Sequence, residues 1–152
     1  MLYTVLDTPI GPVLGTTDQE AAVTGLWFDR TPREGWRRDD CALTPLREQL
    51  AAYFAGDLRD FDLALAPAGT PWQRTVWEAL AEVPYGTTLS YGELAARLGC
   101  PSACRAVGAA NGRNPISVIV PCHRLIGSTG KLTGYGGGLH RKEWLLRHER
   151  AG

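Results

Sequence analysis

A thiol and an imidazole are adjacent in the C-terminal half of the chain, at Cys122 and His123, directly after Pro121. A reactive cysteine needs a base that takes its proton, and that base needs a partner that orients it. The predicted partner is the carboxylate of Glu149. Because adjacent residues do not face one another on a strand or a helix, the proton passes either across a sharp turn after Pro121 or through a water. The alternative is a buried small side chain beside a histidine of structural use only.

Two predicted elements position these groups. Residues 116–120 form a short, β-branched apolar run, which predicts a buried extended segment that brings the thiol to a fixed place. A helix over residues 139–149 carries Glu149 in its final turn. Its leucines, Leu145 and Leu146, are predicted to face inward, and its cationic side chains are predicted to face outward, namely Arg141, Lys142 and Arg147.

Ahead of these elements the sequence predicts three helices with clear starts. Thr70 and Gln73 form a capping box, and an apolar stripe follows over residues 72–80. The tryptophans on that stripe are better explained as core than as a platform for stacked bases. A second capping box, Ser90 with Glu93, starts a helix that stops at Gly99. Ser102 is predicted to cap the next helix, over residues 103–110, and the last two helices form a helix-turn-helix.

The second helix of this pair has few side chains that could read base edges. It contains small residues, among them Ala106 and Gly108, and a single cation, Arg105. A sequence-specific regulator reads the major groove with longer polar side chains, which are missing here. A small-faced helix is suited to close approach, either to a partner helix or to a widened minor groove.

The N-terminal half predicts a small antiparallel sheet covered by one helix. Residues 2–6, 12–16 and 22–28 are the expected strands, and residues 61–65 alternate like an edge strand. Thr44 is predicted to cap a helix that runs to about Phe54, with Pro45 in its first turn. No catalytic constellation is found before Thr70. The predicted domains are therefore 1–69, which is α/β, and 70–152, which is mainly α.

Charge and cysteine usage limit the possible partners and compartments. Residues 1–70 contain 6 Lys and Arg against 11 Asp and Glu, a net charge of −5, and residues 71–152 contain 10 against 5, a net charge of +5. The C-terminal half is thus the one that could meet a polyanion. The four cysteines lack the spacing of a disulfide framework or zinc knuckle, as expected for reduced thiols in the cytoplasm. No segment predicts a leader or a membrane span.

Several linked motifs make the chain resemble a known family over residues 70–149. They are Asn114-Pro115, Pro121-Cys122-His123-Arg124, Gly134-Tyr135-Gly136-Gly137-Gly138 and Lys142-Glu143-Trp144-Leu145-Leu146. In order and spacing they resemble the O6-alkylguanine-DNA alkyltransferases. The resemblance implies a ribonuclease-H-like N-terminal domain and a winged helix-turn-helix-like C-terminal domain. It implies irreversible transfer of an alkyl group from O6-alkylguanine in double-stranded DNA to Cys122 itself, by a monomer that uses no metal or organic cofactor.

The same resemblance assigns roles to the site residues. Glu149 orients His123, the base, and Tyr91 assists rotation of the nucleotide and the departure of the guanine. Arg105 enters the base stack in place of the flipped nucleotide, while the helix with Ala106 and Gly108 lies in the minor groove. The backbone amide of Tyr135 binds the substituted oxygen, and the carbonyls of Cys122 and Leu125 read the guanine amino group. The remaining site residues are motif or pocket-wall positions, namely Asn114, Arg124 and Ser128.

Three other functions remain to be compared with this one. A non-catalytic alkylated-DNA-binding protein would lack the nucleophilic cysteine, which is present at position 122. A helix-turn-helix regulator would need base-reading side chains. A bifunctional adaptive-response protein would need an additional N-terminal cysteine-zinc module, and only Cys41 lies there. The sequence does not fix the range of alkyl groups, activity on O4-alkylthymine, or the roles of Cys41, Cys100 and Cys104.

Overall fold

The computed structural model describes residues 1–130, 132, 135 and 137–151. The chain divides into two compact units, Met1–Ala68 and Gly69–Gly152. Each unit is built around its own buried apolar side chains. Within the described residues, no helix is long and apolar enough to cross a membrane.

The N-terminal unit is a four-stranded sheet with the strand order β3-β2-β1-β4. The three predicted strands are present, as β1 (Leu2–Thr8), β2 (Gly11–Thr17) and β3 (Val23–Phe28), and both of their pairings are antiparallel. The sheet is not wholly antiparallel, however, because β4 (Arg37–Arg38) pairs with β1 in parallel. The backbone N–H of Arg37, in β4, donates to the Met1 carbonyl, and that of Asp39, just after β4, donates to the Tyr3 carbonyl.

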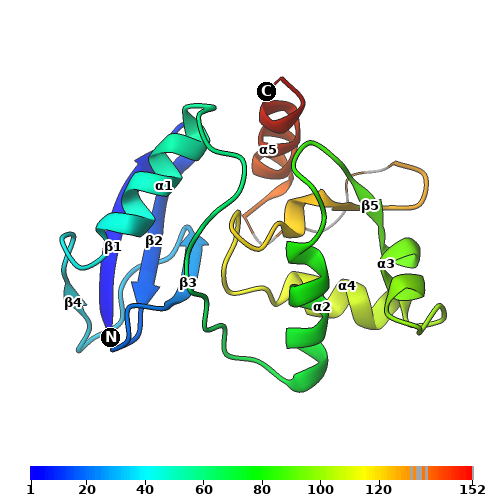
Figure 1. Ribbon diagram of the computed structural model, residues 1–152, viewed down its shortest axis with the longest axis horizontal. Helices are drawn as coiled ribbons and strands as arrows, with labels where there is room; N and C mark the ends of the chain where they lie inside the picture. The colour runs from blue at the N-terminus through cyan, green and yellow to red at the C-terminus, as the bar shows by residue number, and fades with distance from the viewer. Residues whose placement is uncertain (131, 133–134, 136, 152) are drawn as a thin grey trace. The chain divides into compact units, whose positions relative to one another are not determined.

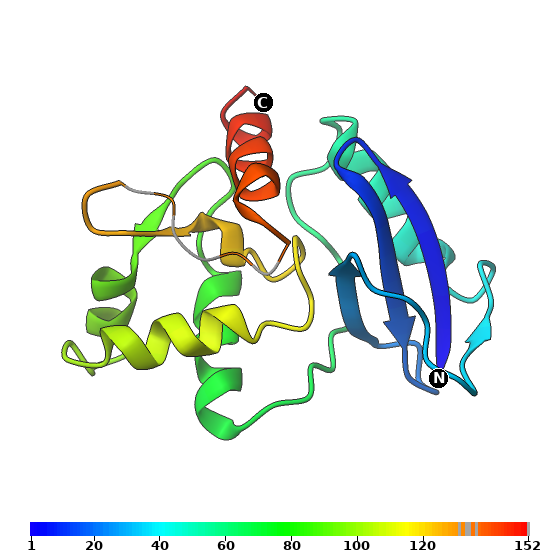
Figure 2. The ribbon, with the colours of Figure 1, turned by 180° about the vertical axis from the view of Figure 1, so that it is seen from behind.

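One helix, α1 (Thr44–Phe54), covers a face of this sheet (Figures 1 and 2). It buries Leu46, Leu50 and Tyr53. Gly15 on β2 allows the close approach, because a Cβ there would lie 2.7 Å from a methyl carbon of Leu46. The prediction that Thr44 caps the helix is wrong. Leu43 is the N-cap residue, and the Thr44 hydroxyl instead donates to the backbone oxygen of Asp40.

The predicted edge strand over residues 61–65 is reduced to one bridge between Leu65 and Val23. The physical reason is a competing partner. The side chain of Gln49, on α1, accepts from the backbone N–H of Asp62 at 2.8 Å and donates to its carbonyl at 2.9 Å. The start of the segment is thereby held by a helix side chain and not by a neighbouring strand.

In the C-terminal unit, two of the predicted helix starts are confirmed. The complete capping boxes of Thr70 with Gln73 and of Ser90 with Glu93 begin α2 (Pro71–Ala81) and α3 (Tyr91–Arg97). The predicted cap at Ser102 is wrong, because α4 (Cys104–Gly112) starts after Ala103, without a side-chain cap. Its start is fixed from within the turn, where the Ala103 amide donates to Cys100.

Two tryptophans on α2 hold α4, which crosses α2 in both ribbon views (Figures 1 and 2). The indole N–H of Trp77 donates to the Ala110 carbonyl at 2.8 Å, and that of Trp72 donates to Ala106 at 3.2 Å. The two acceptors are one helical turn apart on α4. Trp77 is buried, so the interpretation of the stripe as core is confirmed for it.

The remaining elements surround the predicted nucleophile. After α4 come η1 (Cys122–Arg124), a single 3₁₀ turn, and β6 (Leu125–Ile126), which pairs in parallel with β5 (Leu89–Ser90). The final helix is α5 (Leu139–Ala151), which packs on η1. Residues 116–120 are buried as predicted, but they are not extended. Val118 has a φ of 72°, and the Val120 amide donates back to Ile116, so the run is a tight turn.

Candidate active site

The predicted nucleophile, Cys122, lies at the start of η1, where the backbone reverses after Pro121. The Arg124 amide donates to the Pro121 carbonyl at 2.9 Å, and the Cys122 amide donates to Val120 at 2.8 Å. The chain therefore makes the sharp turn after Pro121 that was one of the two routes considered for the proton, the other being a water. It places the Cys122 thiol and the His123 ring on a rigid, buried segment.

Asn114 fixes the turn that leads into η1. Its amide nitrogen donates to the carbonyls of Val120 and Ile116, and its amide oxygen accepts the Ile116 N–H at 3.0 Å. One polar side chain therefore satisfies three backbone groups inside a buried segment. Burial raises the pKa of Cys122, and a side-chain hydrogen bond from Asn114 opposes that shift. The motif position predicted from the resemblance thus has a direct structural use.

Glu149 binds both residues that follow Cys122, His123 and Arg124. Its Oε2 lies 2.7 Å from Nε2 of His123, which is the contact expected from the sequence. Arg124 donates to both of its oxygens, from Nε at 2.8 Å and from the terminal nitrogen at 2.9 Å. Glu149 is 3 % exposed, so its carboxylate is enclosed although the residue lies in the last turn of α5. A buried carboxylate with this many donors is held in one orientation.

The loop after α2 completes the binding of Arg124. Its remaining terminal nitrogen donates to the Val83 carbonyl at 2.7 Å, and its guanidinium carbon lies 5.7 Å from the ring centre of Tyr85. Gly86, in the same loop, has a φ of 78°, and a Cβ there would lie 3.4 Å from the Glu149 backbone oxygen. Sequence reasoning missed Val83 and Gly86, because backbone carbonyls and close approaches have no side-chain signature.

The hydrogen bond to Glu149 determines the tautomer of His123. A carboxylate only accepts, so Nε2 carries the ring proton, and the neutral ring keeps a lone pair on Nδ1. Nδ1 is buried and has no hydrogen-bond partner within the described part of the chain. It is therefore the atom of this ring that can accept a proton.

Burial dominates the protonation equilibria of both groups. It raises the pKa of the Cys122 thiol, against the Asn114 hydrogen bond and the charge of Lys142, which lower it. Burial also lowers the pKa of His123, against the Glu149 hydrogen bond, which raises it. The charges of Arg124 and Lys142 lower the pKa of His123 further. The resting pair is accordingly a neutral thiol beside a neutral imidazole.

The predicted outward direction of two α5 cations is wrong. Arg141 and Lys142 are buried, and only Arg147 of the three is exposed. Arg141 donates to the Gly137 carbonyl, and Lys142 donates to the Leu125 carbonyl. A sequence signal for Lys142 existed. It precedes Leu145, Leu146 and Glu149 by three, four and seven residues, which is the spacing of one helical face.

The groups expected to contact guanine lie in η1 and in the residues that follow it. The Leu125 side chain is buried and its carbonyl already accepts from Lys142, while the Cys122 carbonyl accepts the Leu125 N–H. Ser128 is exposed. Burial raises the pKa of Tyr135, and its carbonyl accepts from the Gly138 amide. Gly134 and Gly136, the neighbours of Tyr135 in the glycine-rich motif, lie outside the described residues.

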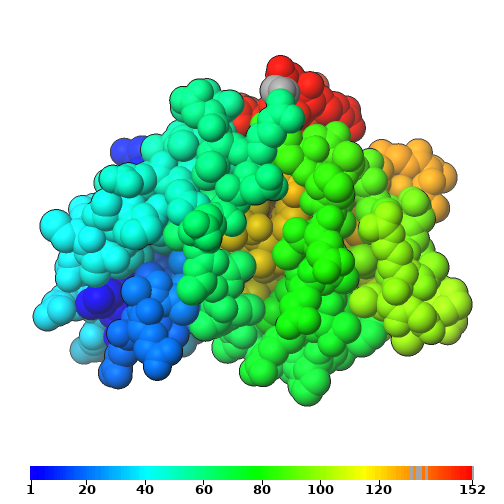
Figure 3. Space-filling view, viewed as in Figure 1, coloured from blue at the N-terminus to red at the C-terminus, as the bar shows by residue number. Residues whose placement is uncertain are grey.

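The helix-turn-helix belongs to the yellow-green part of the molecule in Figure 3. Arg105 and Ala106 on α4 are exposed, as are the free thiols of Cys100 and Cys104. A Cβ on Gly108 would lie 3.6 Å from the Tyr91 ring, so these two residues are neighbours across α3 and α4. The structure thus brings Tyr91 and Gly108 together, and keeps Arg105 on the exposed surface.

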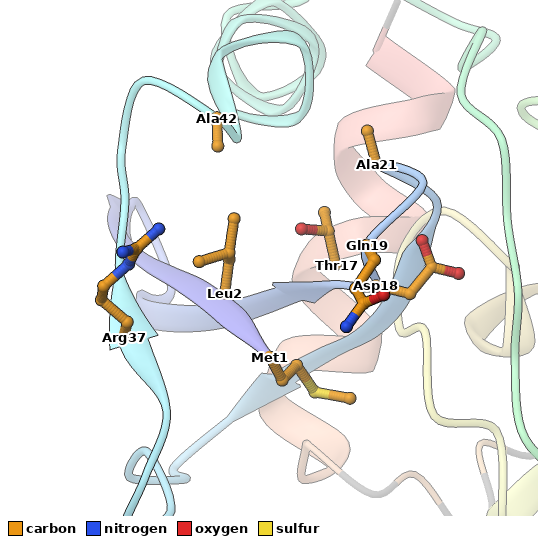
Figure 4. Close-up of a pocket in the computed structure, with 8 residues that line it drawn as sticks. All are labelled: Met1, Leu2, Thr17, Asp18, Gln19, Ala21, Arg37 and Ala42. Atoms are coloured by element: carbon orange, nitrogen blue, oxygen red, sulfur yellow. The ribbon is translucent and has the colours of Figure 1, made fainter.

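The N-terminal unit contains a hollow whose lining differs in chemistry from the surroundings of Cys122. It has a volume of about 440 Å³ and is lined partly by Leu2, Thr17, Asp18 and Arg37. The charged side chains of Asp18 and Arg37 lie on opposite sides of it (Figure 4). Its lining contains no thiol or imidazole. Nowhere in the described chain do three His, Cys, Asp or Glu residues group in a way that could hold a metal ion.

Two family models match the chain. Residues 71–151 match the DNA binding domain of 6-O-methylguanine DNA methyltransferase, and residues 1–67 match its ribonuclease-like domain. A protein from Mycolicibacterium paratuberculosis named methylated-DNA--protein-cysteine methyltransferase is 51 % identical, with 97 % of this chain and 92 % of that protein covered. One of the same name from Methanosarcina acetivorans is 49 % identical, with 98 % of each chain covered.

Solved structures agree with these matches. The crystal structure of Mycobacterium tuberculosis OGT in complex with DNA has a TM-score of 0.93 and 49 % identity, over 99 % of this chain and 94 % of that one. The O6-methylguanine-DNA methyltransferase from Pyrococcus kodakaraensis has a TM-score of 0.71 at 23 % identity, over 97 % and 98 % of the two chains. At that identity the likeness concerns the fold alone.

Proposed function

This chain belongs to the 6-O-methylguanine DNA methyltransferase family, and we propose that it repairs DNA by moving the alkyl group of O6-alkylguanine onto the sulfur of its own Cys122. The observation that carries the proposal is the buried array of Cys122, His123 and Glu149 on one rigid turn and one helix. A thiol with a base and an oriented acid is the arrangement of a nucleophile. No other described part of the chain groups these chemical types.

The transfer exchanges a proton for an alkyl group. The Cys122 thiol gives its proton to Nδ1 of His123, directly or through a water, and the resulting thiolate attacks the alkyl carbon. The new sulfur–carbon bond forms as the bond from that carbon to O6 breaks, and its electron pair stays with the guanine. Uptake of one proton then leaves unmodified guanine in the DNA and a thioether on the protein.

Glu149 raises the pKa of His123, and Arg124 lowers it. The carboxylate holds the imidazole in the tautomer that keeps Nδ1 available, and it stabilises the imidazolium that forms in the reaction. Arg124 keeps that carboxylate ionised and in place through two donors. The same positive charge lowers the pKa of His123, so the ring is neutral at rest and ready to accept. Arg124 is thus proposed as a positioning residue.

Substrate recognition is proposed to use backbone groups around η1 and surface groups on the helix pair. The target atom lies inside the duplex, so the nucleotide must rotate out of the stack before the thiolate can reach it. The Cys122 and Leu125 carbonyls would accept from the guanine amino group, and the Tyr135 amide would donate to O6. A carbonyl oxygen has two lone pairs, so the bond from Lys142 leaves Leu125 able to accept a second donor.

The exposed surface of α4 is proposed to lie in the minor groove of the duplex, beside the flipped nucleotide. Arg105 would fill the space left in the stack, and the small residues Ala106 and Gly108 would permit close approach. Tyr91, next to Gly108, would assist rotation of the nucleotide and supply a proton to the leaving guanine. Ser128 would form part of the pocket wall.

A thioether is not hydrolysed by any group in this array, so we propose that each molecule acts once and needs no metal or organic cofactor. We also propose a monomer in the cytoplasm, where the four free thiols would stay reduced. Residues 70–152 would carry the reaction and DNA binding, and residues 1–69 would form a second domain without a catalytic role.

The test is incubation with a duplex that carries isotopically labelled O6-methylguanine, followed by peptide mass mapping. We expect one labelled methyl group per protein molecule, on Cys122. The Cys122→Ala variant should bind the duplex and transfer nothing, while Cys104→Ala, which removes an exposed thiol, should transfer at the normal rate. Normal transfer by Cys122→Ala would overturn the assignment. Binding without transfer by the unaltered protein would indicate a lesion-binding protein instead.

A further inference from the structure

Asn111 is a buried polar residue that the steps above do not use. It lies in the last turn of α4 and is 4 % exposed. Its amide nitrogen donates to the Cys122 carbonyl at 3.5 Å. Its amide oxygen is also enclosed, and it has no hydrogen-bond partner among the residues that the structure describes. An enclosed acceptor without a donor is costly, so this oxygen calls for a partner from outside the described chain.

The position of this oxygen relates it to the reacting sulfur. The nitrogen and oxygen of an amide group are joined through one carbon, so the oxygen lies close to the Cys122 carbonyl that the nitrogen contacts. The backbone carbonyl of Asn111 also accepts the Asn114 N–H at 3.3 Å, at the turn that leads to η1. Cys122 and Asn111 are equally enclosed, each being 4 % exposed. A base that enters to present its alkyl carbon to the sulfur is therefore brought near the Asn111 oxygen.

Three acceptors surround this place, and the Asn111 oxygen is the one that is least used. Each carbonyl or amide oxygen has two lone pairs. The Cys122 carbonyl already accepts the Leu125 N–H and the Asn111 amide. The Leu125 carbonyl accepts from Lys142. The Asn111 oxygen accepts from none of the described residues, so both of its lone pairs are available.

The proposed substrate offers one kind of donor to such an oxygen. Guanine carries an amino group on its minor-groove edge, whereas N7 and O6 are acceptors. An alkyl group on O6 also removes the proton from N1, so the amino group is the only donor left on the base. It has two N–H bonds and can serve two acceptors at once. An acceptor without a donor at the reaction site thus matches the amino group of O6-alkylguanine.

We propose that Asn111 is a specificity-determining residue of the alkyl-transfer site: its amide oxygen accepts a hydrogen bond from the amino group of the flipped O6-alkylguanine. The inference rests on the proposed function and deepens it, because it adds a side chain to the backbone carbonyls assigned to this group. The second N–H of the amino group remains for the Leu125 carbonyl. A purine without the amino group, such as O6-methylhypoxanthine, would leave the Asn111 oxygen unpaired in a closed site and would be bound less tightly.

The first test combines a variant of Asn111 with a base that lacks the amino group. In a Cys122→Ser background, which has no thiol, dissociation constants are measured for duplexes that carry O6-methylguanine or O6-methylhypoxanthine. We expect a preference for the guanine duplex of about tenfold or more, and we expect Asn111→Leu, of similar shape, to lower it by about fivefold. Arg105→Ala, on the same helix, should weaken both duplexes alike and keep the preference. An unchanged preference in folded Asn111→Leu would overturn the proposal.

The second test keeps Asn111 in place and does not depend on how its variants fold. The chain has two asparagines, and Asn111 is the one that follows an alanine, so labelling of that residue pair identifies its side-chain NMR signals. In Cys122→Ser, we expect the side-chain carbonyl carbon of Asn111 to move downfield when the O6-methylguanine duplex binds, and to move much less with the hypoxanthine duplex. Equal shifts with the two duplexes would contradict the hydrogen bond. Neither measurement uses methyl transfer, so failure of repair activity and failure of this inference are distinguishable.

Discussion

At the scale of single residues, the site depends on Glu149, which is shared by His123 and Arg124. Both partners lie within 2.9 Å of its oxygens in a buried environment. If Glu149 becomes neutral, Arg124 is left without its counter-ion and His123 loses the partner that sets its tautomer. One substitution thus affects both the stability of the fold and the rate of proton transfer.

We predict that Glu149→Gln slows single-turnover methyl transfer by on the order of 100-fold and changes the dissociation constant for the duplex much less. The free energy of unfolding should fall by about 3 kcal/mol, because a buried ion pair is broken. Rapid-quench kinetics, DNA titration and chemical denaturation measure the three quantities. Glu143→Gln, on the exposed face of α5, is the matched control and should behave like the unaltered protein. Equal losses in transfer and in DNA binding would make Glu149 structural only.

The pH dependence of transfer should report the basicity of His123. Burial lowers the pKa of the ring below its ordinary value of about 6.5, and only the neutral ring can accept the thiol proton. Transfer should therefore keep its rate as the pH falls to about 6.5 and decline only below that value. In Arg124→Met the charge that lowers this pKa is gone, so the acid limb should move to higher pH. Arg124→Lys keeps the charge and should retain the original limb.

Sequence reasoning at this scale predicted the contact between Glu149 and His123 but placed two cations wrongly. The contact of Glu149 with His123 could be expected from residue types alone, and it is present at 2.7 Å. Arg141 and Lys142 were expected outside because long charged side chains are rarely fully buried. Their burial depends on backbone carbonyls of Gly137 and Leu125, which no side-chain pattern reveals.

At the scale of elements, helix starts were predictable where the cap lies within the element and not where the preceding turn takes up the capping groups. Thr70 and Ser90 cap their helices with a residue three positions on, as local sequence predicts. Thr44 has a competing acceptor in the preceding turn. Residues 116–120 have strand-like composition, but Asn114 takes up the backbone groups that a neighbouring strand would bind.

The small face of α4 allows a prediction that separates packing from DNA contact. Gly108 and Gly112 both lie on this helix, and the ideal Cβ of each has at least 3.6 Å of clearance or no neighbour within 4 Å. Alanine at either position should raise the free energy of unfolding, by about 0.5–1 kcal/mol at an interior site. Gly108→Ala should also weaken binding to the duplex, whereas Gly112→Ala should not. Unchanged affinity in Gly108→Ala would assign the bare surface to helix packing.

At the scale of the whole molecule, the chain combines a net charge of zero with halves of opposite sign. The excess of positive charge is in residues 71–152, which also hold the helix pair and the thiol. This distribution favours one part of the chain for contact with a polyanion and leaves the other acidic. Net charge alone would therefore have concealed the DNA-binding half.

Affinity for the lesion-bearing duplex should fall linearly with the logarithm of the salt concentration, since phosphate contacts release counterions. Arg105→Ala should reduce affinity. If Arg105 is inserted into the base stack and not bound to a phosphate, the salt slope should stay the same. A slope lower by about one would place this side chain on a phosphate instead. Fluorescence anisotropy over a salt series measures both quantities, and Arg97→Ala, an exposed cation at the end of α3, provides the comparison.

The carboxylate that is proposed to orient the base comes from α5, twenty-seven residues after Cys122. The two groups meet only when α5 docks on η1. A chain cut just ahead of Glu149 would keep the sulfur and lose the carboxylate that holds His123, so we expect it to transfer no alkyl group.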